Sequence, residues 1–96
     1  MIPIPLNPET EALARRVVWF ESPEEALADP VRFMAYAMEW AAPEDMEIIR
    51  HYVNDADFLE ALEKAPPGII RQRSWAYWNL KMGRNPVPPQ PTRKFA

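Results

Sequence analysis

The sequence predicts an all-α fold, a compact bundle of five or six short helices that ends in an extended, proline-rich C-terminal arm. First, four prolines directly follow Asn7, Ser22, Asp29 and Ala42, and a proline that opens a helix costs no hydrogen bond. Second, the chain has only two glycines, no Asn-Gly or Asp-Gly pair and no long alternation of apolar and polar residues, so strands have little support. Third, the prolines from Pro86 onward recur too closely for a helix to continue.

The first helix is predicted over residues 8–20, with Leu13, Val17 and Phe20 facing the core. A short second helix is predicted over residues 23–28. Three of the four proline positions follow a serine, asparagine or aspartate, and these side chains accept hydrogen bonds from the free N–H groups at a helix start. Acidic residues in the first turns complement the positive end of each helix dipole.

The third helix, over residues 30–42, is apolar almost all round. Only Arg32 and Glu39 are charged in it, and their spacing of seven residues places them on a common face. Its apolar residues form two adjoining stripes, Met34, Ala37, Met38 and Ala41 in one and Phe33, Tyr36 and Trp40 in the other. Such a helix is either the central helix of the bundle or part of a surface that binds a partner, and we favour the central position.

Two further helices are predicted over residues 43–53 and from Asn54 or Asp55 to about Ala65. Their inward residues are expected to be Met46, Ile49 and Val53 in the fourth helix and Phe58, Leu59 and Leu62 in the fifth. The Pro-Pro-Gly sequence of residues 66–68 ends the fifth helix, because the residue before a proline avoids helical geometry. Ile69 and Ile70 then reach the core from an extended segment.

A last helix is predicted from Ser74, as its capping residue, to about Met82, where Gly83 stops it. Residues 1–85 are therefore expected to form a single helical domain, and residues 86–96 an extended proline-rich basic tail.

Charge is divided sharply along the chain. Residues 66–96 contain six basic side chains and no acidic one, a net charge of +6, whereas residues 1–65 contain fourteen acidic and five basic side chains, a net charge of −9. The protein is therefore an acidic body with a basic C-terminal segment, and such asymmetry concerns partners more than fold.

Few residues are suited to catalysis. The chain has no cysteine, its two serines are explained as helix caps, and the lone His51 has no evident carboxylate or serine partner. Neither glycine belongs to a phosphate-binding loop, and no acidic group has the spacing of a calcium site. We therefore expect no enzyme, no catalytic residue, no metal and no cofactor. No segment is long and apolar enough to cross a bilayer and no signal peptide is evident, so we expect a cytoplasmic protein.

The favoured function is non-catalytic binding of a protein partner that offers an acidic groove. The basic and aromatic side chains of the C-terminal segment would pair with carboxylates and supply apolar anchors. The candidate partner-binding residues are Arg71, Arg73, Trp75, Tyr77, Trp78, Lys81, Arg84, Arg93, Lys94 and Phe95.

Two alternatives remain. Basic residues interleaved with aromatic ones over residues 69–84 are typical of nucleic-acid binding, although the net charge of −9 on the body would repel a phosphate backbone, and Trp75, Trp78 and Met82 also have the spacing of a core-facing helix. In the other alternative, the arm packs back on its own acidic body or on a second copy of it, as in a homo-oligomer.

Several sequence segments carry a resemblance to a protein group. These are APPGIIRQRSWAYWNL at residues 65–80 with the following Gly-Arg-x-Pro-x-Pro-Pro-x-Pro at residues 83–91, SPEEALADP at residues 22–30 and FMAYAM at residues 33–38. Over residues 20–95 the chain resembles a group of small uncharacterised bacterial proteins encoded beside nucleotidyltransferase-like toxins, which makes them candidate antitoxins. The resemblance implies that the arm and the helix at residues 75–82 cover the acidic, metal- and nucleotide-binding cleft of such a toxin.

Overall fold

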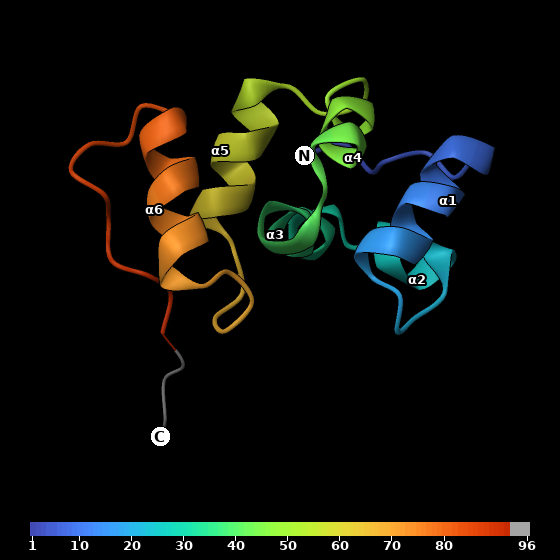
Figure 1. Cartoon of the computed structure of the whole chain (residues 1–96), viewed down its shortest axis with the longest axis horizontal. Coiled ribbons are helices and arrows are strands. Elements are labelled where there is room, and N and C mark those ends of the chain that lie inside the picture. Colours follow the sequence, from blue (N-terminus) through green and yellow to red (C-terminus); the bar gives the residue numbers. More distant parts are fainter. Residues whose placement is uncertain (93–96) are drawn as a thin grey trace.

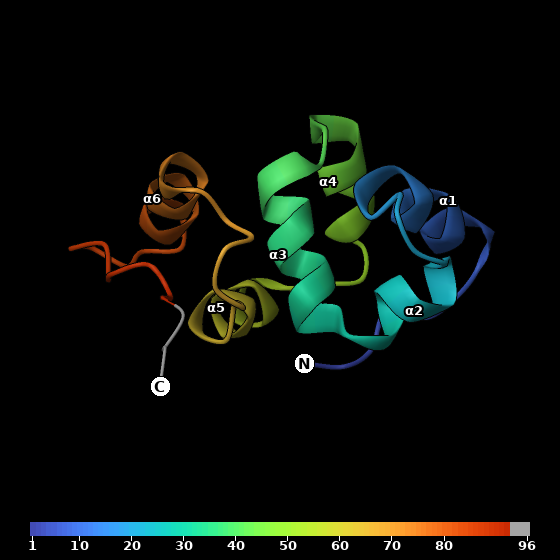
Figure 2. The same ribbon diagram turned by 90° about the horizontal axis from the view of Figure 1, so that it is seen from below.

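Over residues 1–92, which the computed structural model describes, the protein is an all-α bundle of six short helices, as the sequence predicts. Figures 1 and 2 show the arrangement from two directions. The helices are α1 (Pro8–Val17), α2 (Pro23–Ala28), α3 (Pro30–Trp40), α4 (Pro43–Ile49), α5 (Asp55–Glu63) and α6 (Gln72–Lys81). In both views α1 and α2 lie on one side of α3, while α5 and α6 lie on the other.

Helix α3 is the central helix, so the favoured interpretation of its apolar sequence is confirmed. It contacts α1, α2, α5 and α6. Phe33, Met34 and Ala35 are fully buried, and Ala37 and Met38 are nearly so. The aromatic stripe divides, because Phe33 is in the core, Tyr36 is half-buried, and Trp40 is 58% exposed at the last residue of the helix.

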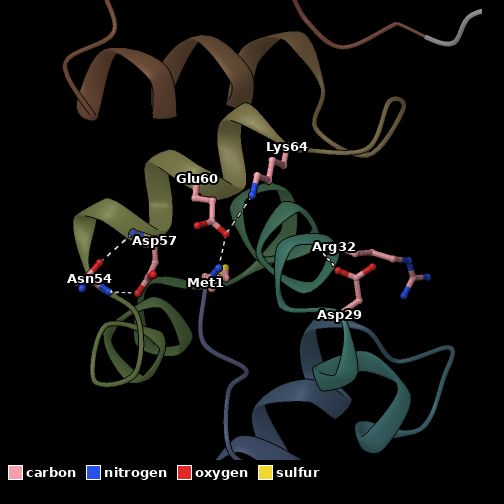
Figure 3. Close-up of polar contacts among 7 residues, drawn as sticks. All are labelled: Met1, Asp29, Arg32, Asn54, Asp57, Glu60 and Lys64. Atoms are coloured by element: carbon pink, nitrogen blue, oxygen red, sulfur yellow. Dashed lines mark hydrogen bonds and ion pairs between the residues drawn. The ribbon is translucent and has the colours of Figure 1, made fainter.

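Capping side chains fix the helix beginnings. Asn7 Oδ1 accepts a hydrogen bond from the Thr10 backbone at 2.9 Å, and the Thr10 hydroxyl accepts one in return from the Asn7 backbone. Asn54 and Asp57 form the same reciprocal pair at the start of α5 (Figure 3). Ser22 and Asp29 cap α2 and α3, as the sequence predicts, whereas Ala42 leaves α4 without a side-chain cap.

The predicted helix ends are less accurate than the beginnings. Helix α1 ends at Val17, and the chain then turns outward, so Phe20 is 49% exposed instead of facing the core. Phe20 packs edge-on against Tyr36 and Trp19 at the surface. The prediction that Ser74 caps the last helix is also wrong, because α6 begins at Gln72 and has no side-chain cap.

Both tryptophans of α6 are buried, at 4% exposure for Trp75 and 7% for Trp78. The Trp78 indole N–H donates to the Met38 backbone oxygen at 2.9 Å, and its ring stacks on the buried Phe58 at 5.4 Å between centroids. Trp78 therefore joins α6 to both α3 and α5, and it is a core residue.

The proline-rich segment packs back on its own bundle instead of extending freely. After Gly83, which adopts the positive φ of 81° that favours glycine, the chain returns alongside α6 (Figure 1). The Trp75 indole N–H donates to the Pro88 carbonyl at 2.7 Å, and the Gln90 amide donates to the Ile70 carbonyl at 3.0 Å. Residues 86–92 therefore do not project as a free arm, and the alternative in which the arm packs on its own protein is correct for this segment.

The amino-terminal segment is also attached to the bundle. The ammonium group of Met1 lies against the Glu60 carboxylate, which also faces Lys64 Nζ at 3.8 Å (Figure 3). None of the helices in the part of the chain that the structure describes is both long and apolar enough to span a membrane.

Candidate functional site

A groove lies between α6 on one side and α4 with the end of α3 on the other. It has a volume of about 560 Å³. Its lining residues are Met38, Ala41, Pro43, Met46, Glu47, Arg50, Arg73, Ser74, Tyr77, Trp78 and Lys81. We call this feature the α4–α6 groove.

The α6 wall combines positive charge with an exposed aromatic ring. Arg73, Tyr77 and Lys81 follow one another at intervals of four residues, so the helical repeat places them along one face. Tyr77 is 55% exposed. Lys81 Nζ lies 5.5 Å from the centre of the Tyr77 ring and 5.3 Å from that of Trp78, and it donates to the Tyr77 hydroxyl at 3.3 Å. The cation is therefore held above the two rings.

The base of the groove is apolar and formed in advance. Trp78 lines the groove although it is only 7% exposed, and its hydrogen bond to Met38 and its stacking on Phe58 hold the ring in place. Met38 is buried beside it, and Met46 of α4 is half-buried. Methionine side chains adapt their shape to different apolar contacts, so a fixed indole beside two methionines suits a variable apolar ligand group.

The charges around the groove do not cancel. The charge of Arg50 is paired within the protein, because Arg50 forms an ion pair with Asp55 at 2.9 Å and its guanidinium lies 4.6 Å from the centre of the Phe58 ring. Glu47 places one carboxylate on the α4 wall. On the α6 wall, Arg73 and Lys81 form no ion pair with any acidic side chain of residues 1–92. The α6 wall is consequently electropositive.

The structure brings together four of the candidate residues, namely Arg73, Tyr77, Trp78 and Lys81, all at the α4–α6 groove. Trp75 is elsewhere: its side chain is buried under the proline-rich segment, where it cannot act as an exposed anchor. Trp78 is likewise nearly buried, although it lines the groove. For both tryptophans the spacing typical of a core-facing helix, which the sequence also displays, is the correct interpretation.

Two further candidate residues, Arg71 and Arg84, lie outside the groove. Arg71 is exposed, its backbone N–H donates to Glu39 at 2.7 Å, and its guanidinium lies 5.0 Å above the Trp40 ring. Arg84 has a buried Nη1 that bonds to none of the described residues. Arg93, Lys94 and Phe95 lie outside the described residues.

Sequence reasoning missed the wall opposite α6. From the sequence, Met38 and Met46 are expected in the core, and only the placement of α3 and α4 relative to α6 shows that they also line a groove. A second hollow was missed entirely, and its lining includes the exposed Trp19, Phe20 and Trp40. The aromatic stripe of α3 indicated that Trp40 contributes to an apolar face, but nothing in the sequence placed Trp40 beside the turn between α1 and α2.

Among the described residues, the lone histidine and the groups with shifted pKa values lie outside the groove. Among the described residues that line the groove there is no histidine, and His51 is exposed outside it. Within residues 1–92, no group of three or more histidine, cysteine or acidic side chains is placed to hold a metal ion. The pKa of Tyr52 is raised by its hydrogen bond to Glu9, and that of Glu60 is lowered by the amino-terminal ammonium, but neither residue lines the groove.

Comparison of the chain with protein-family models, with curated proteins and with solved structures gives no match.

Proposed function

We propose that this protein is a non-catalytic protein-binding module that holds an acidic surface of its partner at the α4–α6 groove. The observation that carries the proposal is the α6 wall: two cations, Arg73 and Lys81, have no acidic partner within residues 1–92 and lie on either side of the exposed Tyr77. Tyrosine and arginine are enriched among residues that dominate interface energetics, and unpaired cations at a groove attract carboxylates.

Binding to protein is favoured over binding to nucleic acid by the burial of Trp75 and Trp78. Stacking on single-stranded bases needs exposed ring faces, and the stacked face of Trp78 is taken by Phe58. Tyr77 remains as the one exposed aromatic ring of α6 among the described residues. The acidic body, with its net charge of −9 over residues 1–65, adds repulsion toward a phosphate backbone.

The finer proposal is that the partner is a nucleotidyltransferase-like toxin, which would make this protein an antitoxin. Its support is the resemblance carried by residues 22–30, 33–38, 65–80 and 83–91, together with the electropositive α6 wall, which suits the acidic cleft of such an enzyme. A homo-oligomer is the alternative in which the acidic surface belongs to a second copy.

The test compares two charge-reversed variants of equal net charge. Arg73→Glu with Lys81→Glu alters the groove, whereas Arg15→Glu with Lys64→Glu alters exposed cations on α1 and beyond α5. Each protein is mixed at micromolar concentration with the product of the adjacent gene and analysed by gel filtration with light scattering. We expect co-elution for the natural protein and the control variant and none for the groove variant.

Absence of co-elution for the natural protein, at concentrations where its own mass is that of a monomer, would refute the toxin partner. A dimeric mass that the groove variant alone loses would assign the groove to a second copy. Salt-sensitive binding of single-stranded nucleic acid that depends on Arg73 would replace the protein-binding proposal.

A further inference from the structure

We propose that the α4–α6 groove binds a short acidic segment of the partner, in which one apolar side chain inserts over Trp78 and two flanking carboxylates pair with Arg73 and Lys81. This inference rests on the proposed function and specifies the ligand of the same site. Three independent properties of the groove lead to it: the spacing of its cations, the character of its base and the charge difference between its walls.

The cation spacing sets the distance between the two ligand carboxylates. Arg73 and Lys81 are eight residues apart on one continuous helix, so their Cα atoms are separated by roughly 12 Å along the axis. Tyr77 lies midway between them. Two glutamates seven residues apart on a ligand helix are separated by about 10.5 Å, and their side chains can span the remainder. An apolar residue between the glutamates would then face Tyr77 and Trp78.

The base of the groove determines what lies between the carboxylates. Trp78 and Met38 are nearly buried, at 7% and 5% exposure, and the more exposed Ala41, Pro43, Met46 and Tyr77 complete the apolar lining of the groove, whose volume is about 560 Å³. A partner with charges alone would leave this surface in contact with water. An inserted leucine or aromatic side chain removes apolar area from water, which stabilises the complex in proportion to the area buried. The pocket therefore favours an amphipathic acidic segment over a purely acidic one.

The α4 wall gives the site a direction. Glu47 lies on this wall, and the charge of neighbouring Arg50 is offset by Asp55. A ligand carboxylate placed toward α4 would face Glu47 and be repelled. Acidic residues are thus accepted only along α6, and the ligand edge toward α4 must be neutral or basic. This arrangement discriminates against a uniformly acidic polymer, including a nucleic-acid backbone.

The probe for this inference is a fluorescein-labelled, helix-favouring peptide of about three to four turns. It carries two glutamates seven residues apart, with a leucine between them and alanine or glutamine elsewhere. One control peptide has the same composition with the glutamates adjacent, a second has lysines for the glutamates, and a third has serine for the leucine. Binding to the full chain is measured by fluorescence anisotropy, and the contact surface is mapped by amide chemical-shift changes.

We expect the parent peptide to bind at the groove. Each control peptide should bind with an affinity at least about tenfold lower, since each lacks either the glutamate spacing, the negative charge or the apolar side chain that matches the groove. The double substitution Arg73→Gln with Lys81→Gln should lower the affinity for the parent peptide by about tenfold or more. Glu47→Gln should strengthen its binding by about two- to fivefold, because a repelling carboxylate is removed. Shift changes should centre on Tyr77 and Lys81.

Three outcomes would overturn the acidic-segment inference: no groove binding of the parent peptide up to about 1 mM, equal or tighter binding of the lysine peptide, or shift changes centred on Trp19 and Trp40. Each of these outcomes leaves groove-dependent co-elution of the whole partner intact, so failure of this inference is distinguishable from failure of the proposed function.

Discussion

Trp78 donates its indole N–H to the backbone oxygen of Met38 at 2.9 Å, across 40 residues of sequence. The bond ties the middle of α6 to the last turn of α3. Both residues also line the α4–α6 groove, so one contact determines the packing of the bundle and the shape of the proposed binding site.

Replacing Trp78 with alanine should destabilise the fold by about 3–5 kcal/mol, because it removes a buried ring and leaves a cavity. Urea unfolding followed by circular dichroism measures this change. Tyr77→Ala is the matched control on the same helix, and its 55% exposure predicts a loss of less than about 1 kcal/mol. Equal losses for the two variants would contradict the assignment of Trp78 to the core.

Trp75→Phe should loosen the proline-rich segment without unfolding the bundle. The substitution keeps an apolar ring but removes the indole N–H that donates to the Pro88 carbonyl. This hydrogen bond contributes about 1 kcal/mol. Backbone 15N relaxation should show greater mobility at Val87 and Gln90, while the amides of α3 stay nearly unchanged. If mobility increases equally in both places, Trp75 stabilises the whole bundle and not the segment.

Neutralising the groove cations should leave stability nearly unchanged. Arg73→Gln and Lys81→Gln remove no ion pair with residues 1–92, so each should lower the free energy of unfolding by less than about 1 kcal/mol. For Lys81, most of this loss would come from its contact with the aromatic rings. Arg16→Gln provides the contrast, because it leaves the largely buried Asp45 without its partner at 2.7 Å. A larger loss for Arg73→Gln than for Arg16→Gln would indicate a structural role for Arg73.

Giving α4 the capping side chain that it lacks should stabilise the protein. Ala42 has extended backbone geometry at the start of α4, is exposed and makes no side-chain cap. Ala42→Ser should add about 0.5–1 kcal/mol, measured by thermal unfolding. Asn54→Ala, which removes the existing cap of α5, should lower stability by about 1 kcal/mol. A loss of stability in Ala42→Ser would show that α4 does not begin at Pro43.

The Tyr52–Glu9 hydrogen bond should make stability depend on alkaline pH. The bond, at 2.6 Å, raises the pKa of Tyr52 above its ordinary value of 10.0 because it favours the neutral phenol beside a carboxylate. A raised pKa in the folded state contributes stability below pH 10.0 that is lost as the pH rises through the folded-state value. The free energy of unfolding, measured with urea between pH 8 and pH 11, should therefore fall more steeply with pH in the natural protein than in Tyr52→Phe. Equal slopes would contradict the assigned bond.

The helix beginnings could be predicted because their causes are local. A proline and a capping side chain one residue earlier are visible in the sequence, and α2 and α3 begin at the predicted residues. The ends depend on packing elsewhere. Residues 18–20 have a helical pattern, but the chain turns after Val17 to reach α2, and Phe20 packs against Tyr36 of α3 at the surface.

The site was predictable only in part, for a related reason. The interleaving of basic and aromatic residues over residues 69–84 is local information, and it placed Arg73, Tyr77 and Lys81, which line the α6 wall, among the candidates. The same pattern cannot decide whether the neighbouring Trp78 faces solvent or the core, since a helix presents aromatic residues at identical spacing in both cases. That decision, and the α4 wall, depend on contacts between residues some 30 to 40 positions apart.

Because Trp78 belongs to the core and also lines the groove, the proposed binding surface depends on the packing of α6 against α3. Heating that separates α6 from α3 removes this surface together with the fold. A ligand of the groove would therefore raise the melting temperature, by an amount that grows with the logarithm of the ratio of its concentration to its Kd. A shift in melting temperature is thus a label-free test for ligands of the proposed site.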